Sequence, residues 1–204
     1  MWALLNSDNT INKILTRPKA LSIGDVNYPA NIFSMWTSAE LEALKIYEVV
    51  VDNTNFKNQE YYINTNQTFA FADGVVTSSY GTATAKPLDD VLWTAEEEAA
   101  DEIGNVVEGE VKQPGIRQGY KDTINSQAGG LLQDTDWMVV RAAEGGTAVP
   151  SAITTWRAAV RTKANAMCTA IDNAANIDAL IALYVYNDAT PPVRPLGEFP
   201  ILGA

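Results

Sequence analysis

The spacing of apolar residues changes along the chain, and this change constrains the fold more than any other feature of the sequence. In residues 1–90 apolar residues form short runs that polar turn residues separate. From residue 116 onward they recur every third or fourth position, as on one face of an α-helix. The sequence therefore predicts an α+β protein, with a β-rich N-terminal domain, an α-helical C-terminal unit and an extended tail.

Two local signals predict where elements of the β-rich region turn and begin. Asp73-Gly74 lies between two apolar runs and predicts a two-residue hairpin, because glycine accepts the positive φ of a type I′ turn. Thr37 and Glu40 have the spacing of a capping box and predict the one helix expected in this region. The predicted strand segments are residues 2–5, 11–15, 20–23, 47–51, 61–63, 69–71 and 74–79.

Residues 91–115 differ in composition from both of their neighbours. Residues 96–110 are rich in carboxylates and contain no lysine or arginine, and Gly104, Gly109 and Pro114 interrupt regular structure. Carboxylate oxygens suit Ca²⁺, but no Asp-x-Asp-x-Asp-Gly loop occurs, and contiguous glutamates point apart. We therefore interpret this stretch as an acidic, solvated connector, and we expect no metal and no other cofactor.

Three helices and one strand are predicted in residues 116–190. The first helix carries an apolar residue at every fourth position from Ile116 to Ala128, and the strand covers residues 137–140. The best amphipathic helix begins at Pro150-Ser151, and a short helix begins at Asn176. The prolines of residues 191–204 predict an extended arm, of a kind that often ties subunits together.

These patterns divide the chain into four segments. Residues 1–90 form a β-rich domain with one short helix, residues 91–115 the acidic connector, residues 116–190 a helical domain, and residues 191–204 the proline-rich arm. The length of 204 residues suits one large domain or two small ones.

Missing residue types exclude whole classes of chemistry. The chain contains no histidine and one cysteine, Cys168. Zinc sites built from cysteine and histidine within one chain are therefore excluded, as are Ser-His-Asp and Cys-His nucleophile systems. Cys168 lies among apolar residues at helical spacing and is interpreted as a small buried hydrophobic residue. We expect the protein not to be an enzyme.

The charge balance limits the partners of the protein. The chain has 14 basic and 25 acidic residues, and its formal net charge is −11. Nucleic acid and anionic membrane surfaces attract clustered lysine and arginine, so neither is an expected partner. No apolar run is long enough to cross a bilayer, and the N-terminus lacks the features of a signal peptide. We expect the protein to be made in the cytoplasm and to stay there, or to leave inside a larger particle.

Asp134, Asp136 and Trp137 are the best candidates for chemistry in this sequence. Two nearby carboxylates can divide acid and base roles, as in sugar hydrolysis. They follow a predicted helix, however, where aspartate and threonine commonly bond the backbone, and nothing in the spacing sets the distance between the carboxyl groups. The structural interpretation is favoured, and a carboxylate-dependent glycan hydrolase is the least favoured function.

Large aromatic and arginine side chains are candidates for binding a partner. Trp137 and Trp156 could be exposed binding residues, although core positions in the helical unit are favoured for both. Arg157 and Arg161 lie one turn apart and are expected to form a basic stripe that pairs with the acidic connector or with a partner.

Two segments together suggest a family. Residues 131–137 (Leu-Leu-Gln-Asp-Thr-Asp-Trp), followed by Pro150 and residues 155–161 (Thr-Trp-Arg-Ala-Ala-Val-Arg), resemble the C-terminal region of bacteriophage tail-fibre assembly chaperones. Residues 28–33 (Tyr-Pro-Ala-Asn-Ile-Phe) resemble the opening of the same kind of phage protein. The match covers a quarter to a third of the chain. It lacks the usual proline-rich linker between Trp137 and Trp156, and the chain continues past the matched helix.

The resemblance implies a protein that helps fibre subunits to trimerise and that in some systems remains at the fibre tip. The expected partner is a phage tail or tail-fibre protein, in a homo-oligomer or a larger assembly, in the host cytoplasm during assembly and then on the virion. A purely structural virion protein, such as a fibre, tail adaptor or capsid decoration protein, is the alternative. The residues expected to contact the partner are Asp136, Trp137, Trp156, Arg157 and Arg161.

Overall fold

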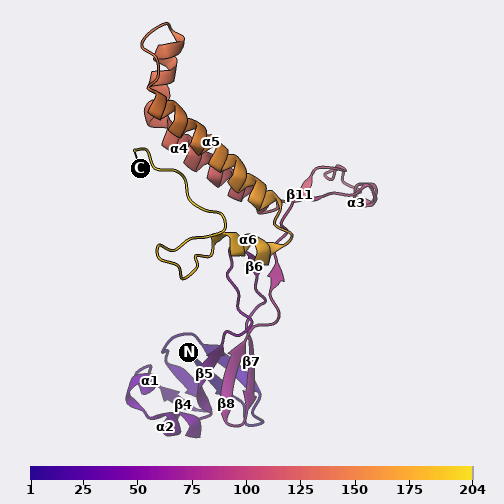
Figure 1. Cartoon of the computed structure of the whole chain (residues 1–204). Helices are drawn as coiled ribbons and strands as arrows, with labels where there is room; N and C mark the ends of the chain where they lie inside the picture. Colours follow the sequence, from indigo (N-terminus) through magenta and orange to yellow (C-terminus); the bar gives the residue numbers. More distant parts are fainter. Residues whose placement is uncertain (204) are drawn as a thin grey trace. The chain divides into compact units, whose positions relative to one another are not determined.

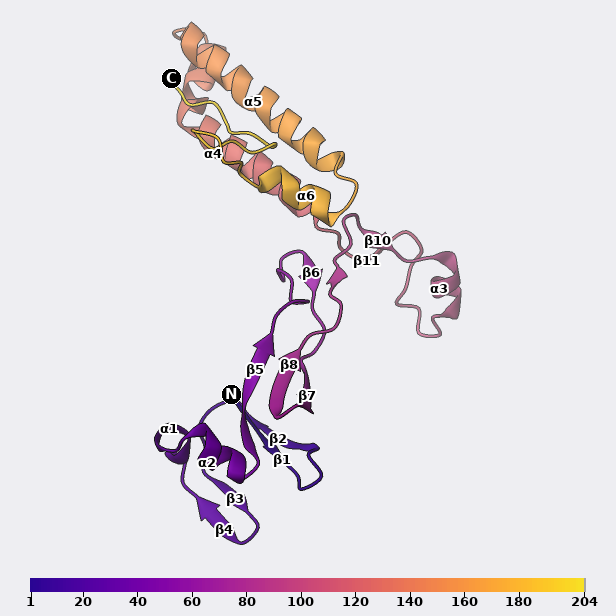
Figure 2. The same ribbon diagram turned by 60° about the horizontal axis from the view of Figure 1, so that its bottom comes forward.

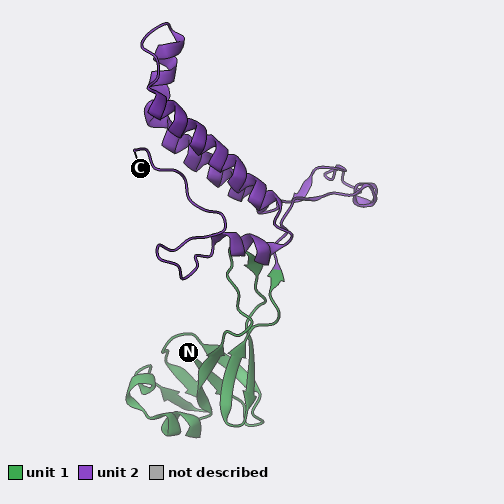
Figure 3. Ribbon diagram, in the orientation of Figure 1, with its two compact units in different colours: residues 1–84 green, residues 85–204 purple. Residues whose placement is uncertain are grey.

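The computed structural model describes residues 1–203 and shows an α+β fold with strands in the N-terminal part and helices in the C-terminal part (Figure 1). It divides into two compact units, residues 1–84 and 85–204 (Figure 3). The expected boundary at residue 90 and the separate connector 91–115 differ from this division. Backbone bonds from Ile116 to Pro87 and from Arg117 to Leu88 tie the residues before the expected boundary to the start of the first long helix.

The first unit is built on a five-stranded sheet with the order β2-β1-β5-β8-β7. Neighbouring strands are antiparallel except β5 and β8, which run parallel. The two edge strands, β2 and β7, also contact each other, so the sheet curls on itself. The strands are β1 (Trp2–Leu5), β2 (Ile11–Leu15), β5 (Ile46–Asp52), β7 (Thr68–Ala72) and β8 (Val75–Ser79).

Alternation along the strands gives the sheet an apolar cluster on each face. One cluster contains Ala3, Val49 and Val76, all buried. The other contains Ile46 and is covered by two short helices, α1 (Ile32–Met35) and α2 (Ser38–Ala43). The sequence predicted α2 but not α1, which has no side-chain cap at Asn31 to reveal it.

Both local signals in the first unit are confirmed. Thr37 accepts a hydrogen bond from the Glu40 amide, and Glu40 accepts one from the Thr37 amide at 2.8 Å, so the capping box starts α2 as predicted. Asp73 and Gly74 have φ values of 52° and 80° and join β7 to β8. The remaining short strands are β3 (Leu21–Ile23), which pairs with β4 (Val26–Tyr28), β6 (Tyr62–Ile63) and β9 (Thr84–Ala85).

The acidic stretch is more regular than predicted. It contains an antiparallel ribbon of β10 (Val91–Leu92) and β11 (Val111–Gln113), and a helix, α3 (Ala95–Ala100), that begins with a second capping box. Lys112 forms an ion pair with Glu97 and lies 4.7 Å from the centre of the Trp93 ring. No residue of α3 is buried, so this stretch has the solvated surface that the sequence predicted.

Three helices follow in the second unit, before the C-terminal segment: α4 (Arg117–Ala143), α5 (Ser151–Asp172) and α6 (Ile177–Tyr184). Helices α4 and α5 form an antiparallel hairpin and lie side by side (Figures 1 and 2). Ile124 and Ala128 of α4 pack with Val160, Ala164 and Met167 of α5 in one core, as the helical spacing predicted. None of the helices in residues 1–203 is both long enough and apolar enough to span a membrane.

The strand predicted at residues 137–140 is wrong, because these residues continue α4 without interruption. Each valine disfavours the helix by about 0.5 kcal/mol relative to alanine. This is small compared with the free energy gained when α4 packs along α5 without interruption. Thr135 is 5% exposed, and Met138 and Ala142, one and two turns further on, are also partly covered. The face toward α5 therefore extends beyond the point at which the sequence pattern weakens.

Candidate partner-binding surface

Arg157 ties the two helices of the hairpin together. Its side chain is 11% exposed. One terminal nitrogen donates to the Leu132 carbonyl at 2.8 Å and to the Thr135 hydroxyl at 2.5 Å, and the other donates to an Asp136 carboxylate oxygen at 2.7 Å. Two predicted contact residues, Asp136 and Arg157, thus meet each other within the chain. The guanidinium is used to join α5 to α4, and only the Asp136 carboxylate remains accessible.

Thr135 belongs to this cluster, although sequence reasoning did not single it out. It is one of two buried polar residues in the described chain, and its hydroxyl also donates to the Leu132 carbonyl at 2.9 Å. Thr135 lies seven positions, or about two helical turns, after Ala128. Extending the apolar face of the helix by two turns would therefore have predicted a buried position at Thr135.

The basic stripe expected from Arg157 and Arg161 does not form, because Arg157 turns into the hairpin. Arg161 is exposed and makes no ion pair with another residue of the described chain. It is the member of the pair that a partner can reach.

Trp156 holds the C-terminal segment against the hairpin. It is half-buried beside the core, and its indole nitrogen donates to the Pro200 carbonyl at 2.9 Å. Lys163 donates to the Leu196 carbonyl at 2.8 Å, and the Leu196 side chain is 2% exposed. Of the arm predicted at residues 191–204, the described residues 191–203 have no regular secondary structure. They fold back on their own unit, so Leu196 is not available to bind another subunit.

Trp137 is exposed, contrary to the core position favoured for it. Its exposed fraction is 55%, and the guanidinium carbon of Arg141 lies 4.8 Å from the centre of its ring. Val140, one turn further on, is 56% exposed. Because α4 turns by 100° per residue, these three residues lie on the side away from Thr135. We call Trp137, Val140 and Arg141 the Trp137 face.

The candidate chemical groups do not assemble into a reaction centre. Asp134 and Asp136 are exposed on α4, and Asp136 is paired with Arg157. Cys168 is partly buried, with its sulfur 3.8 Å from an Asn125 oxygen, and burial raises the pKa of the thiol. Within residues 1–203, no group of three or more cysteine, aspartate or glutamate side chains is arranged to hold a metal ion.

Comparison with known proteins assigns this chain to no family. No family model matches the sequence, and no curated protein or solved structure is similar to it.

Proposed function

We propose that this protein is associated with a bacteriophage tail fibre, assists its assembly through the α4–α5 hairpin, and is retained on the virion. It acts by contact and not by catalysis, in the host cytoplasm during assembly. The observation that carries the proposal is the Trp137 face, because an exposed tryptophan with an arginine over its ring and an exposed valine beside it has the composition of a binding hot spot. The resemblance of residues 131–161 to tail-fibre chaperones supplies the identity of the partner.

The hairpin presents this face in a fixed geometry. Arg157 joins α5 to α4 through hydrogen bonds to Leu132 and Asp136, five residues and one residue before Trp137. The Arg141 guanidinium lies over the indole ring and favours this orientation of the ring through a cation–π contact. A surface that is already ordered loses little conformational entropy on binding, and tryptophan and arginine are the residue types that dominate binding energy at interfaces.

The proposal is tested by co-expressing the chain with the tail-fibre protein of the same phage and measuring the yield of fibre trimers. Trp137→Ala should lower the affinity for the fibre about tenfold or more, and the trimer yield with it, because an anchor residue is removed. Ile103→Ala is the matched control, because Ile103 is 82% exposed in the same unit but lies outside the hairpin. An equal trimer yield with and without the chain would refute the assembly role.

Retention on the virion is tested separately by mass spectrometry of purified particles. A retained component should be present at a fixed ratio to the fibre protein. If it is absent from particles whose assembly depends on it, the protein is a transient chaperone.

A further inference from the structure

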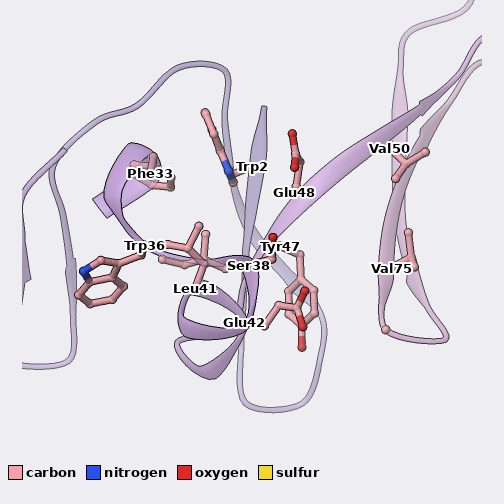
Figure 4. Close-up of a pocket in the computed structure, with 12 residues that line it drawn as sticks. Trp2, Phe33, Trp36, Ser38, Leu41, Glu42, Tyr47, Glu48, Val50 and Val75 are labelled. Atoms are coloured by element: carbon pink, nitrogen blue, oxygen red, sulfur yellow. The ribbon is translucent and has the colours of Figure 1, made fainter. Parts of the chain in front are cut away.

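A pocket of about 320 Å³ lies in the first unit, on the face of the sheet that α1 and α2 cover (Figure 4). Helix α2 contributes Ser38, Leu41 and Glu42, and the opposing wall comes from β5 and the turn before β8. Trp2 reaches the pocket from β1. All of these residues belong to one unit, so the inference is independent of the function proposed for the hairpin.

The charges around this pocket are of one sign. Glu42 and Glu48 line it, both are exposed, and neither forms an ion pair with another described residue. No lysine or arginine is among the lining residues. Glu48 stands directly opposite Trp2 in the register of β5 and β1, so a carboxylate and an indole ring flank the same part of the pocket.

The walls of the pocket are apolar. Leu41 and Ile46 are buried at its base, and Val50 and Val75 line it while remaining 55% and 43% exposed. Trp2 is only partly buried, with its ring 4.8 Å from that of Phe33. The pocket therefore combines apolar walls, an aromatic ring and carboxylates without counter-ions.

We propose that this pocket binds an arginine side chain of a partner protein. The aliphatic stem of arginine packs on apolar walls while its head stays at the polar rim. The planar guanidinium stacks on aromatic rings and donates paired hydrogen bonds to carboxylates. A neutral sugar would use the aromatic ring but would leave both carboxylates without a counter-charge, so the charge complementarity favours arginine.

The test uses the full chain and N-acetyl-arginine amide as the probe, with N-acetyl-citrulline amide as its neutral isostere. The indole N–H resonance of Trp2 should shift and saturate with the arginine probe, with a dissociation constant on the order of 1–10 mM. The citrulline compound should produce no saturable shift. Raising the salt concentration to about 0.5 M should weaken binding of the arginine probe to the unaltered protein. This measurement does not depend on whether any variant folds.

Variants locate the site. Glu48→Gln should weaken binding about threefold, and the double substitution with Glu42→Gln about tenfold. Asp25→Asn is the matched control, because it removes one exposed carboxylate of the same unit outside the pocket and should leave the affinity unchanged. Equal binding of citrulline, or saturation by glucose in place of arginine, would overturn the proposal, as would unchanged affinity in the folded double variant.

Discussion

Arg157 on α5 donates hydrogen bonds to three oxygen atoms of α4. The sequence suggested that Arg157 binds a partner, whereas in the structure it joins two helices of the same chain. Asp136 and Arg157 were expected to contact a partner because of the resemblance of their segments to tail-fibre assembly chaperones. The sequence did not show that they face each other, since that depends on the register of two helices separated by a turn. Trp137 and Arg161 are therefore the candidate contact residues that remain open to a partner without an ion pair inside the chain, and the Asp136 carboxylate is accessible although it is paired with Arg157.

Replacing Arg157 should destabilise the hairpin. Arg157→Ala removes hydrogen bonds from a charged donor and leaves the buried Thr135 hydroxyl with one hydrogen bond fewer, so the free energy of unfolding should fall by about 2 kcal/mol. Urea denaturation followed by circular dichroism at the helix band measures this loss. Arg161→Ala should change the value by less than about 0.5 kcal/mol. Similar losses in the two variants would show that Arg157 does not join the helices.

At the scale of elements, capping and periodicity predicted most of the helices and strands, whereas packing decided their extent. The capping box at Thr37 and the positive-φ turn at Asp73-Gly74 are local, so the sequence contained them completely. Residues 137–140 have strand-forming side chains, yet they are helical because α4 continues along α5. The C-terminal arm also depends on packing, since its place is set by donors on α5.

The C-terminal arm should prove to be part of the fold of the second unit. Leu196→Ala removes a side chain that is 2% exposed and should lower the free energy of unfolding by about 3 kcal/mol. Ile201→Ala, at a position 77% exposed in the same arm, should have an effect below about 0.5 kcal/mol. Urea denaturation of both variants measures the difference. If Leu196→Ala left the free energy of unfolding unchanged, the arm would be detached in solution.

At the scale of the whole molecule, several carboxylates of the second unit form hydrogen bonds and ion pairs that lower their pKa values. A hydrogen bond from Arg117 lowers the pKa of Asp89, and one from Lys112 lowers that of Glu97. Backbone N–H groups, beginning with that of Ile103, lower the pKa of Asp101. These carboxylates bind protons less readily in the folded chain than in the unfolded one, which links stability to pH.

The second unit should lose stability in acid. Groups with a lowered folded pKa contribute their full stabilisation above the unfolded pKa of about 4 and lose it as the pH falls through their folded values. The melting temperature of the helices should therefore be level near pH 6–7 and fall below about pH 4. Thermal scans across this range measure it. Asp101→Asn should flatten the acid limb, and a melting temperature unchanged down to pH 3 would contradict the assignment.

The sequence alone determined the α+β class, the caps and turns, the helical face of α5 and the absence of histidine chemistry, because each depends on neighbours in the chain or on composition. Only the tertiary structure decided that Arg157 binds α4, that Trp137 is exposed, and that Leu196 is buried. It also brought Trp2, Glu42 and Glu48 to one pocket. These outcomes depend on which residues distant in the chain meet, and that is settled by the packing of whole elements against one another.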